Sequence, residues 1–555
     1  MSERSVLFLV SDLAPLTSVG RIRTQKMCKF LPKFGWRTSV LTFEPPLGTL
    51  TDPALLEEIP PDTTVYRVGC PRPIEAPVRW ASRAVRAVRC RRVNRGRASD
   101  HTVSAMPAAS EGKPANPAWL DRLSQGVDRL KSGLTRRLMI PDEGLPGVAP
   151  MTRAAVEITR RNDIDVLVCS VPGFSPWLAA VLAARRTGVP LIVDYRDLWH
   201  GDVLRTWIGP LRTRVELMLE RWCLSHTNAV VTVSEGKTRF VRSLDPTADR
   251  KPFGTICNGF DEDDLAGIAP SRPERDAGRL LLLYTGRLYR HRRIDPLVES
   301  LGRLVTRGEV RQDQVRLRLL GLVEEGQRRR IDELVDRYRL GDVVEAGGYV
   351  TRRESLGQQL GADAVVLVVD PGHTSEGVLP GKITEYISLG RFVLAIAPPG
   401  EARELLKRYG HALWASGDEP ERLDAALRSL VRRWMNDPHF GRRPDPKNTI
   451  PSRRENAAQL AAVLTRVVRE RAAHNGRRTD KRRIGDPCTA KPRFLRAAAR
   501  SGGRPTSRGL QSARTKVRGS PPIVDLESNP TSDIQNGCRR SLRSEFTDPV
   551  TGYGV

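Results

Sequence analysis

The sequence predicts an α/β fold made of two doubly wound parallel sheets. Apolar runs at residues 6–10 and 280–284 are continuous, which is typical of strands buried on both faces of a parallel sheet. Each run starts a series in which strands alternate with segments of helical spacing. Residues 262–278, which hold acids, prolines and glycines, separate the two series as a linker. A chain of 555 residues has room for two such domains with appendages.

The first series opens with the strand at 6–10 and a turn-rich loop at 11–20. Apolar residues at helical spacing then run to Gly35, and a second strand follows at 38–43. The loop lacks the full glycine pattern of dinucleotide sites, so we predict no nicotinamide site. Gly20 permits either a tight turn of the loop or a close approach of its backbone to a ligand.

Polar residues gather where a later strand of the first series ends. The strand at 190–194 runs into Asp194, Arg196 and Asp197, with Trp199 after them. Ligands of open α/β sheets bind beyond the carboxyl ends of the strands. These residues are therefore candidate ligand contacts, and the alternative is an Asp–Arg pair that only supports the turn.

Arginines follow the first strand of the second series. Arg287, Arg290, Arg292 and Arg293 lie just beyond the strand at 280–284. Guanidinium groups bind phosphate oxygens in a bidentate manner, so this loop is a candidate anion site. A solvated basic loop is the alternative.

A short helix is predicted within residues 375–390, between apolar strands. Pro380 suits its first turn and Gly390 its end. Lys382 and Glu385 are three residues apart and share a face beside the helix N-terminus, which favours anions. A lysine and a carboxylate here suit a ligand with a phosphate and a hydroxylated sugar, although a surface Lys–Glu pair would give the same pattern.

These motifs together resemble those of retaining glycosyltransferases of the GT-B fold, in the family 4-like (group 1) group. The likeness is carried by Gly-Lys-x-x-Glu-Tyr at 381–386, Asp-x-Arg-Asp-x-Trp at 194–199 and Gly-Arg at 286–287. It covers about residues 5–470, an insertion excepted. The resemblance implies two Rossmann-like domains that face each other across a cleft.

The resemblance also implies roles for individual residues of the second domain. Glu385 would hold the ribose of a nucleotide sugar, and Lys382 would lie near its phosphates. Arg287 and Arg292 would stabilise the leaving diphosphate, and Glu376 would contact the donor sugar. These groups would supply electrostatic catalysis without an obligatory metal or other cofactor.

In the first domain, the resemblance implies that Gly20 faces the donor phosphates and that Asp194, Arg196 and Asp197 lie on the acceptor side. The sequence departs from the family pattern at several points. Glu376 and Glu385 are separated by eight residues instead of seven, and Arg292 stands where relatives have lysine. Trp177 stands where a histidine is expected, so we predict no catalytic base.

The implied domains are residues 1–265 on the acceptor side and 275–450 on the nucleotide-sugar side, followed by a return helix at 451–472. The predicted appendages are a basic insertion at about 70–140 and a basic disordered tail at 473–555. The formal net charge is +27, and residues 79–97 hold eight arginines and no acid. A basic amphipathic helix of this kind can lie on an anionic membrane surface, and a solvated helix or a disordered arm is the alternative.

We therefore predict transfer of a sugar from a nucleotide diphosphate sugar to a hydroxyl of a saccharide or lipid-linked acceptor, in synthesis of a cell-surface polysaccharide or glycolipid. Eight cysteines without a CxxC pair, and no recognisable secretory signal, predict a cytoplasmic protein, peripheral at the inner face of the membrane. Two alternatives remain open. One is a GT-B-like nucleotide-sugar epimerase; the other is a non-enzymatic basic protein that binds membranes or nucleic acid, and the ordered α/β motifs disfavour nucleic acid.

Overall fold

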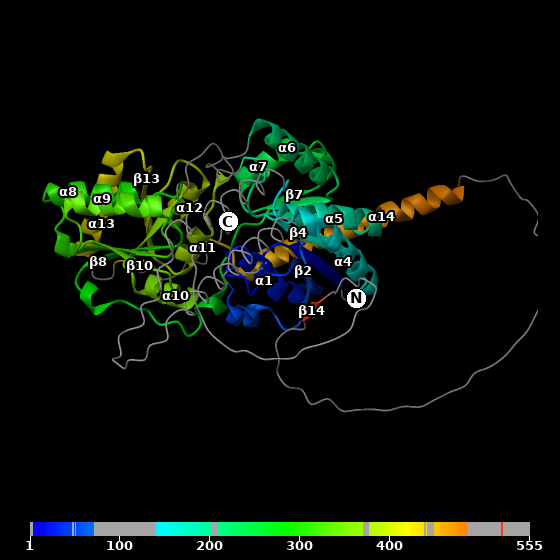
Figure 1. The fold of residues 1–555 in the computed structure, drawn as a ribbon, viewed down its shortest axis with the longest axis horizontal. Helices are drawn as coiled ribbons and strands as arrows, with labels where there is room; N and C mark the ends of the chain where they lie inside the picture. Colours follow the sequence, from blue (N-terminus) through cyan, green and yellow to red (C-terminus); the bar gives the residue numbers. More distant parts are fainter. Residues whose placement is uncertain are drawn as a thin grey trace, which may run out of the picture.

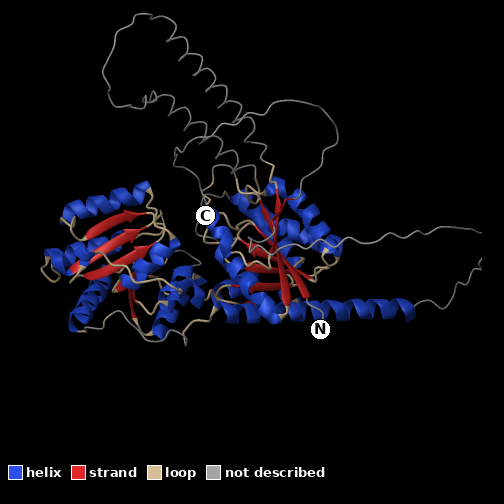
Figure 2. Cartoon of the chain, turned by 90° about the horizontal axis from the view of Figure 1, so that it is seen from below, coloured by secondary structure: helices blue, strands red, loops and turns tan. Residues whose placement is uncertain are grey.

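The computed structural model describes residues 4–46, 49, 51–71, 139–201, 209–289, 291–369, 377–437, 440, 449–484 and 523–525. Two α/β lobes are visible, and helices cover the sheet of each (Figures 1 and 2). Most of the predicted insertion and the predicted site residue Glu376 lie outside the described residues. Within the described ranges, no helix is both long and apolar enough to cross a membrane.

The N-terminal lobe is built on an eight-stranded, all-parallel sheet in the order β14-β3-β2-β1-β4-β5-β6-β7. The strand order reverses between β1 and β4, which is the switch point where open α/β sheets bind ligands. The strands are β1 (Arg4–Val10), β2 (Trp36–Phe43), β3 (Thr64–Val68), β4 (Val166–Val171), β5 (Leu191–Tyr195), β6 (Ala229–Thr232), β7 (Phe253–Thr255) and β14 (Ile523–Asp525).

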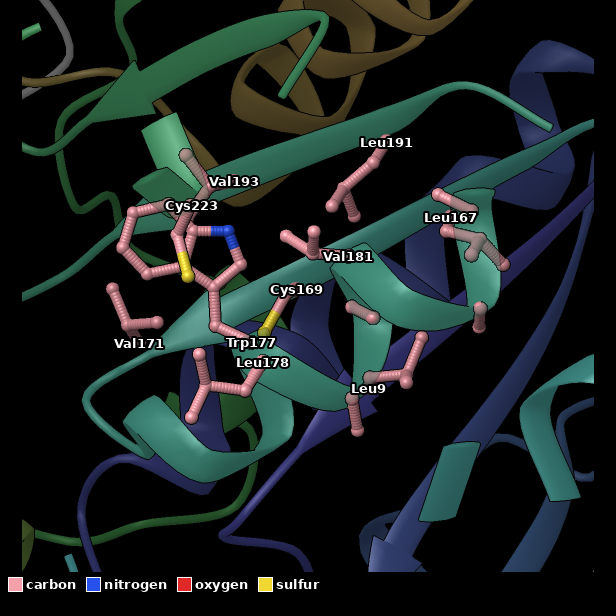
Figure 3. Close-up of a cluster of buried hydrophobic side chains, with 14 of the residues drawn as sticks. Leu9, Leu167, Cys169, Val171, Trp177, Leu178, Val181, Leu191, Val193 and Cys223 are labelled. Atoms are coloured by element: carbon pink, nitrogen blue, oxygen red, sulfur yellow. The ribbon is translucent and has the colours of Figure 1, made fainter. Parts of the chain in front are cut away.

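Helices cover both faces of this sheet because successive side chains of a strand point to opposite sides. Leu7 and Leu9 join the core formed with α4, α5, α6 and α7, whereas Val6 and Phe8 join the core formed with α1 and α14. Figure 3 shows Trp177 of α5 packed over β4 in the first of these cores. The helices are α1 (Arg21–Phe30), α4 (Val148–Arg161), α5 (Phe174–Thr187), α6 (Pro210–Ser225), α7 (Glu235–Leu244) and α14 (Arg453–Ile484).

The C-terminal lobe is built on a six-stranded parallel sheet in the order β10-β9-β8-β11-β12-β13. Its strands are β8 (Leu280–Thr285), β9 (Val315–Leu320), β10 (Val344–Gly348), β11 (Ala364–Val368), β12 (Phe392–Ile396) and β13 (Ala412–Ala415). One face packs on α8, α9 and α13 and the other on α11 and α12. The lobe's helices are α8 (Asp295–Thr306), α9 (Glu325–Tyr338), α10 (Arg352–Gly361), α11 (Gly381–Ser388), α12 (Glu401–Tyr409) and α13 (Pro420–Asn436).

The chain returns from the second lobe to the first through α14. The backbone N–H of Arg453 donates to the carbonyl of Phe260 at 2.6 Å, and Leu460 and Leu464 are buried in the core that includes α1. Helix α14, which follows the C-terminal lobe in the chain, therefore packs on the N-terminal sheet.

The structure describes two segments of the predicted disordered tail, 473–555. One is the end of helix α14, which runs to Ile484. Residues Ile523–Asp525 form β14 and pair in parallel with β3. Without β14, β3 would be an edge strand with unpaired backbone groups, which attract another strand.

Candidate active site

Lys382 lies at the carboxyl end of the second sheet, where β8 ends. It belongs to the first turn of α11, and its Nζ donates to Thr285 Oγ1 at 3.0 Å. The neighbouring Gly286 has φ of +130°, and a Cβ there would lie 2.7 Å from Lys382 Cε. Gly286 is therefore required both by its backbone conformation and by the lysine that packs on it.

Glu385 lies one turn further along α11 and is held by two side chains of α10. Gln359 Nε2 donates to Oε1 at 2.9 Å, and Arg352 Nη1 donates to Oε2 at 3.3 Å. Burial raises the pKa of the Glu385 carboxyl, but the charges of Lys382 and Arg352 outweigh it, so its pKa lies below the ordinary value. Glu385 is thus an ionised hydrogen-bond acceptor.

The same surroundings favour the charged form of Glu385 and disfavour the charged form of Lys382. Burial lowers its pKa, Glu385 raises it, and Arg352 and Arg292 lower it further. The pKa consequently lies below that of an ordinary lysine. An anion bound beside Lys382 would counter this effect by stabilising the charged ammonium.

The two predicted diphosphate arginines lie after β8. Arg287 Nη2 lies 3.2 Å from Glu324 Oε1, and both of these side chains are exposed. The Arg292 guanidinium lies over the ring of Tyr289, 5.0 Å from its centroid, in a cation–π contact. Its charge also acts on Asp197 of the other lobe. This contribution to the lowered pKa of Asp197 is smaller than those of Lys237 and Arg196.

Asp194 is the penultimate residue of β5 in the N-terminal lobe and is buried. Arg23 of α1 binds both of its carboxylate oxygens, with Nε to Oδ2 and Nη2 to Oδ1 each at 2.8 Å. Ser170 Oγ donates to Oδ2 at 3.2 Å. These partners use the carboxylate within the protein, so Asp194 fixes α1 against the end of the sheet.

Gly20 lies against Arg196, so the N-terminal loop meets the end of β5. A Cβ at Gly20 would overlap Arg196 Nη1 and would lie 2.6 Å from Asp12 Oδ2. Arg196 itself is held loosely, with Nη2 3.4 Å from the carbonyl of Pro172 and 3.8 Å from Asp12 Oδ2. A side chain at position 20 would therefore displace the ends of the Arg196 and Asp12 side chains.

Asp197 is the exposed member of the acceptor-side group. Lys237 Nζ of α7 lies 3.2 Å from its Oδ1. Partial desolvation by the nearby protein raises the pKa of the Asp197 carboxyl, but the charges of Lys237, Arg196 and Arg292 outweigh it, so its pKa lies below the ordinary value. An ionised carboxylate is therefore available at this edge of the sheet.

Sequence reasoning missed three of these partners: Arg352, Gln359 and Lys237. A capping box at Thr351 and Glu354, visible as Thr-x-x-Glu, marks the start of α10 and could have located Arg352 in its first turn. No such signal points to Gln359 or Lys237. Across the described ranges, no group of three or more His, Cys, Asp or Glu side chains is arranged to hold a metal ion.

Two family models match the chain and together cover more than half of it. A glycosyl transferase 4-like domain matches residues 20–259, and the glycosyl transferases group 1 model matches residues 269–443. The chain belongs to the group 1 glycosyltransferases. The predicted family and enzyme class are thereby confirmed, and the two parallel-sheet lobes agree with the predicted GT-B fold.

Solved structures resemble this glycosyltransferase at low identity. A glycosyltransferase from Rickettsia africae is 12% identical with a TM-score of 0.49, over 84% of this chain and 99% of its own. HepE from Anabaena, in complex with UDP, is 15% identical with a TM-score of 0.47, over 85% and 99%. Sucrose-phosphate synthase from Thermosynechococcus elongatus is 14% identical with a TM-score of 0.47, over 87% and 100%. None of the curated proteins matches the sequence.

Proposed function

We propose that this glycosyltransferase moves a sugar, with retention of configuration, from a nucleoside diphosphate sugar to a hydroxyl of a saccharide or lipid-linked acceptor. The observation that carries the proposal is the gathering of Lys382, Glu385 and the loop of Arg287 at one edge of the second sheet. Cations and an ionised carboxylate side by side suit a ligand that has phosphates and a ribose.

The donor would lie with its diphosphate near Lys382, Arg287 and Arg292. As the glycosidic bond to the diphosphate breaks, negative charge grows on the leaving phosphate oxygen, and fixed cations lower the free energy of that transition state. Glu385 would accept hydrogen bonds from the ribose hydroxyls. Glu376, which follows β11 in the sequence, would contact the donor sugar, as the family resemblance implies.

The acceptor would bind on the N-terminal edge, where Asp197 and Arg196 lie beside Gly20. Asp197 is ionised and exposed, so it suits a hydrogen bond from an acceptor hydroxyl. We assign cell-surface polysaccharide or glycolipid synthesis, at the cytoplasmic face of the membrane, on the family resemblance and the basic segment at 79–97.

A thermal-shift panel tests the donor site. UDP, GDP, ADP, dTDP and their sugars are added to the full chain and to the variants Glu385→Ala and Arg287→Ala. A ligand at about 100 times its Kd stabilises the native state by about 2.7 kcal/mol, which raises the melting temperature measurably. One base should stabilise the wild type and neither variant.

Matched controls are Glu157→Ala and Arg161→Ala on α4, which form an exposed pair with each other. These controls should respond to the nucleotide like the wild type. If no nucleotide raises the melting temperature, or if the site variants respond like the wild type, the donor site is wrong. Retention is tested separately, by the anomeric configuration of the product in NMR.

A further inference from the structure

The first turn of α7 touches both edges of the proposed active site. It follows β6 and begins at Ser234, the N-cap, whose side chain accepts from the backbone N–H of Lys237. Ser234 and Lys237 are both buried, with 0% and 7% of their surface exposed. This turn therefore is a fixed part of the N-terminal lobe.

On the donor side, the turn contacts the segment that leads into α11. Ser234 Oγ donates to the carbonyl of Gly377 at 2.6 Å. A Cβ on Gly236 would lie 2.6 Å from Gly377 Cα, and a Cβ on Gly377 would lie 2.9 Å from the backbone nitrogen of Lys237. Two glycines thus allow the backbones of the two lobes to pack directly, four residues before α11 begins.

Glu401, the first residue of α12, completes this contact from the C-terminal lobe. Its carboxylate accepts from the backbone N–H of Glu235 at 3.1 Å and from that of Gly236. These amides are among the N–H groups at the start of α7 that have no partner within the helix, where a negative charge is stabilised by the helix dipole. A carboxylate of one lobe therefore caps a helix of the other.

On the acceptor side, the same turn holds the loop after β5. Lys237 Nζ donates to the carbonyl of Arg196 at 2.5 Å and lies 3.2 Å from Asp197 Oδ1. The side chain that fixes the acceptor loop and the backbone that packs on the donor segment are therefore neighbours in one helical turn.

We propose that residues 234–237 are a positioning element that couples the acceptor loop, residues 196–197, to the donor segment, residues 377–380. Glu401 stabilises this coupling through its hydrogen bonds to the start of α7. The inference rests on the proposed function and adds roles for Lys237 and Glu401 that the donor chemistry does not require. Glu401 holds α7 against the donor segment beside the proposed nucleotide site, and Lys237 of the same turn fixes Asp197 for the acceptor.

Amide hydrogen exchange on the full chain, with and without UDP, tests this coupling. The variants are Glu401→Ala and the milder Glu401→Gln, and the control is Glu404→Ala, an exposed acid one turn further along α12. Without nucleotide, Glu401→Ala should speed exchange in peptides 234–238 and 195–200 by about tenfold, since local opening becomes easier. Glu401→Gln, which keeps one acceptor oxygen, should have a smaller effect and Glu404→Ala none.

UDP should slow amide exchange in peptide 381–388 of the wild type and of all three variants. In Glu401→Ala, UDP should no longer slow exchange in peptide 195–200. Unchanged exchange of 195–200 in Glu401→Ala, in both conditions, would overturn the coupling even if 234–238 opened. Absence of UDP protection at 381–388 in the wild type would instead count against a UDP donor site, and the nucleotide-free comparison would still decide the coupling.

Discussion

The two edges of the candidate active site differ in how their charged groups are used. At the N-terminal edge, Asp194 and Arg23 are buried and direct their hydrogen bonds mainly to each other. At the C-terminal edge, Lys382 donates to the hydroxyl of Thr285, and Glu385 keeps further lone pairs beside its two donors. The first arrangement builds a scaffold, whereas the second leaves charge available to a ligand.

The largest effect is expected from breaking the scaffold pair. Arg23→Met leaves the buried carboxylate of Asp194 without its bidentate partner, which destabilises the native state by about 3–5 kcal/mol. Urea denaturation followed by circular dichroism measures the loss. The double variant Arg23→Met with Asp194→Leu should recover part of the stability, because no unpaired charge remains. If Arg23→Met is as stable as the wild type, the pair is not a scaffold.

A change at the opposite edge should leave stability nearly intact and remove ligand binding. Lys382→Ala removes the charge-assisted contact proposed for the diphosphate, which would be worth about 1.5–3 kcal/mol, so the Kd for the nucleotide should rise by roughly tenfold to a hundredfold. Isothermal titration calorimetry measures the Kd. Lys407→Ala, an exposed lysine of α12, is the control and should bind like the wild type. Equal Kd values for the three proteins would remove Lys382 from the site.

A side chain at Gly286 should have a smaller but specific effect. Gly286→Ala forces φ of +130° on an alanine, a strain of about 1–3 kcal/mol, and pushes Lys382 away from Thr285. Gly348→Ala is the control, because Gly348 also has a positive φ, +73°, but a Cβ there would meet no heavy atom within 4 Å. Nucleotide affinity should fall in Gly286→Ala more than in Gly348→Ala. Equal losses would mean that backbone strain alone, and not Lys382, explains the effect.

The smallest expected effect is the pH dependence of nucleotide affinity. Burial lowers the pKa of Lys382, and only the protonated lysine attracts the diphosphate. Affinity should therefore decline as pH rises through this lowered pKa, earlier than for a lysine in solvent with a pKa of 10.5. Lys382→Arg stays charged at every accessible pH and should show a flatter profile in calorimetry between pH 7 and about 10. Parallel profiles would assign the pH effect to another group.

The sequence could predict the features that depend on residues close together along the chain. Continuous apolar runs identify buried parallel strands, and the three-residue spacing of Lys382 and Glu385 places them on one helix face. Strand β3 is harder to recognise, because Arg67 interrupts its apolar pattern and is buried with a hydrogen bond to the carbonyl of Ala14. Strand β14 is only three residues long, and it is recognised as a strand by its pairing with β3.

Contacts between distant segments could not be predicted in the same way. Arg23 and Asp194 are 171 residues apart, and only the packing of α1 on the end of the sheet brings them together. Ser234 and Gly377 are 143 residues apart and meet because the two lobes are in contact. The sequence shows which residue types follow each strand, whereas the distances between strands follow from the order of the sheet.

The central claim is that Glu385 and its neighbours bind a nucleoside diphosphate, and a calorimetric titration of UDP, GDP, ADP and dTDP tests it most directly. Glu385→Gln is the decisive variant, because it keeps the shape of the side chain and removes only the ionised acceptor. One nucleotide should bind the wild type, and the variant should bind it roughly tenfold to a hundredfold more weakly, since hydrogen bonds to a charged group are worth about 1.5–3 kcal/mol. Binding of no nucleotide, or equal binding to both proteins, would contradict the account.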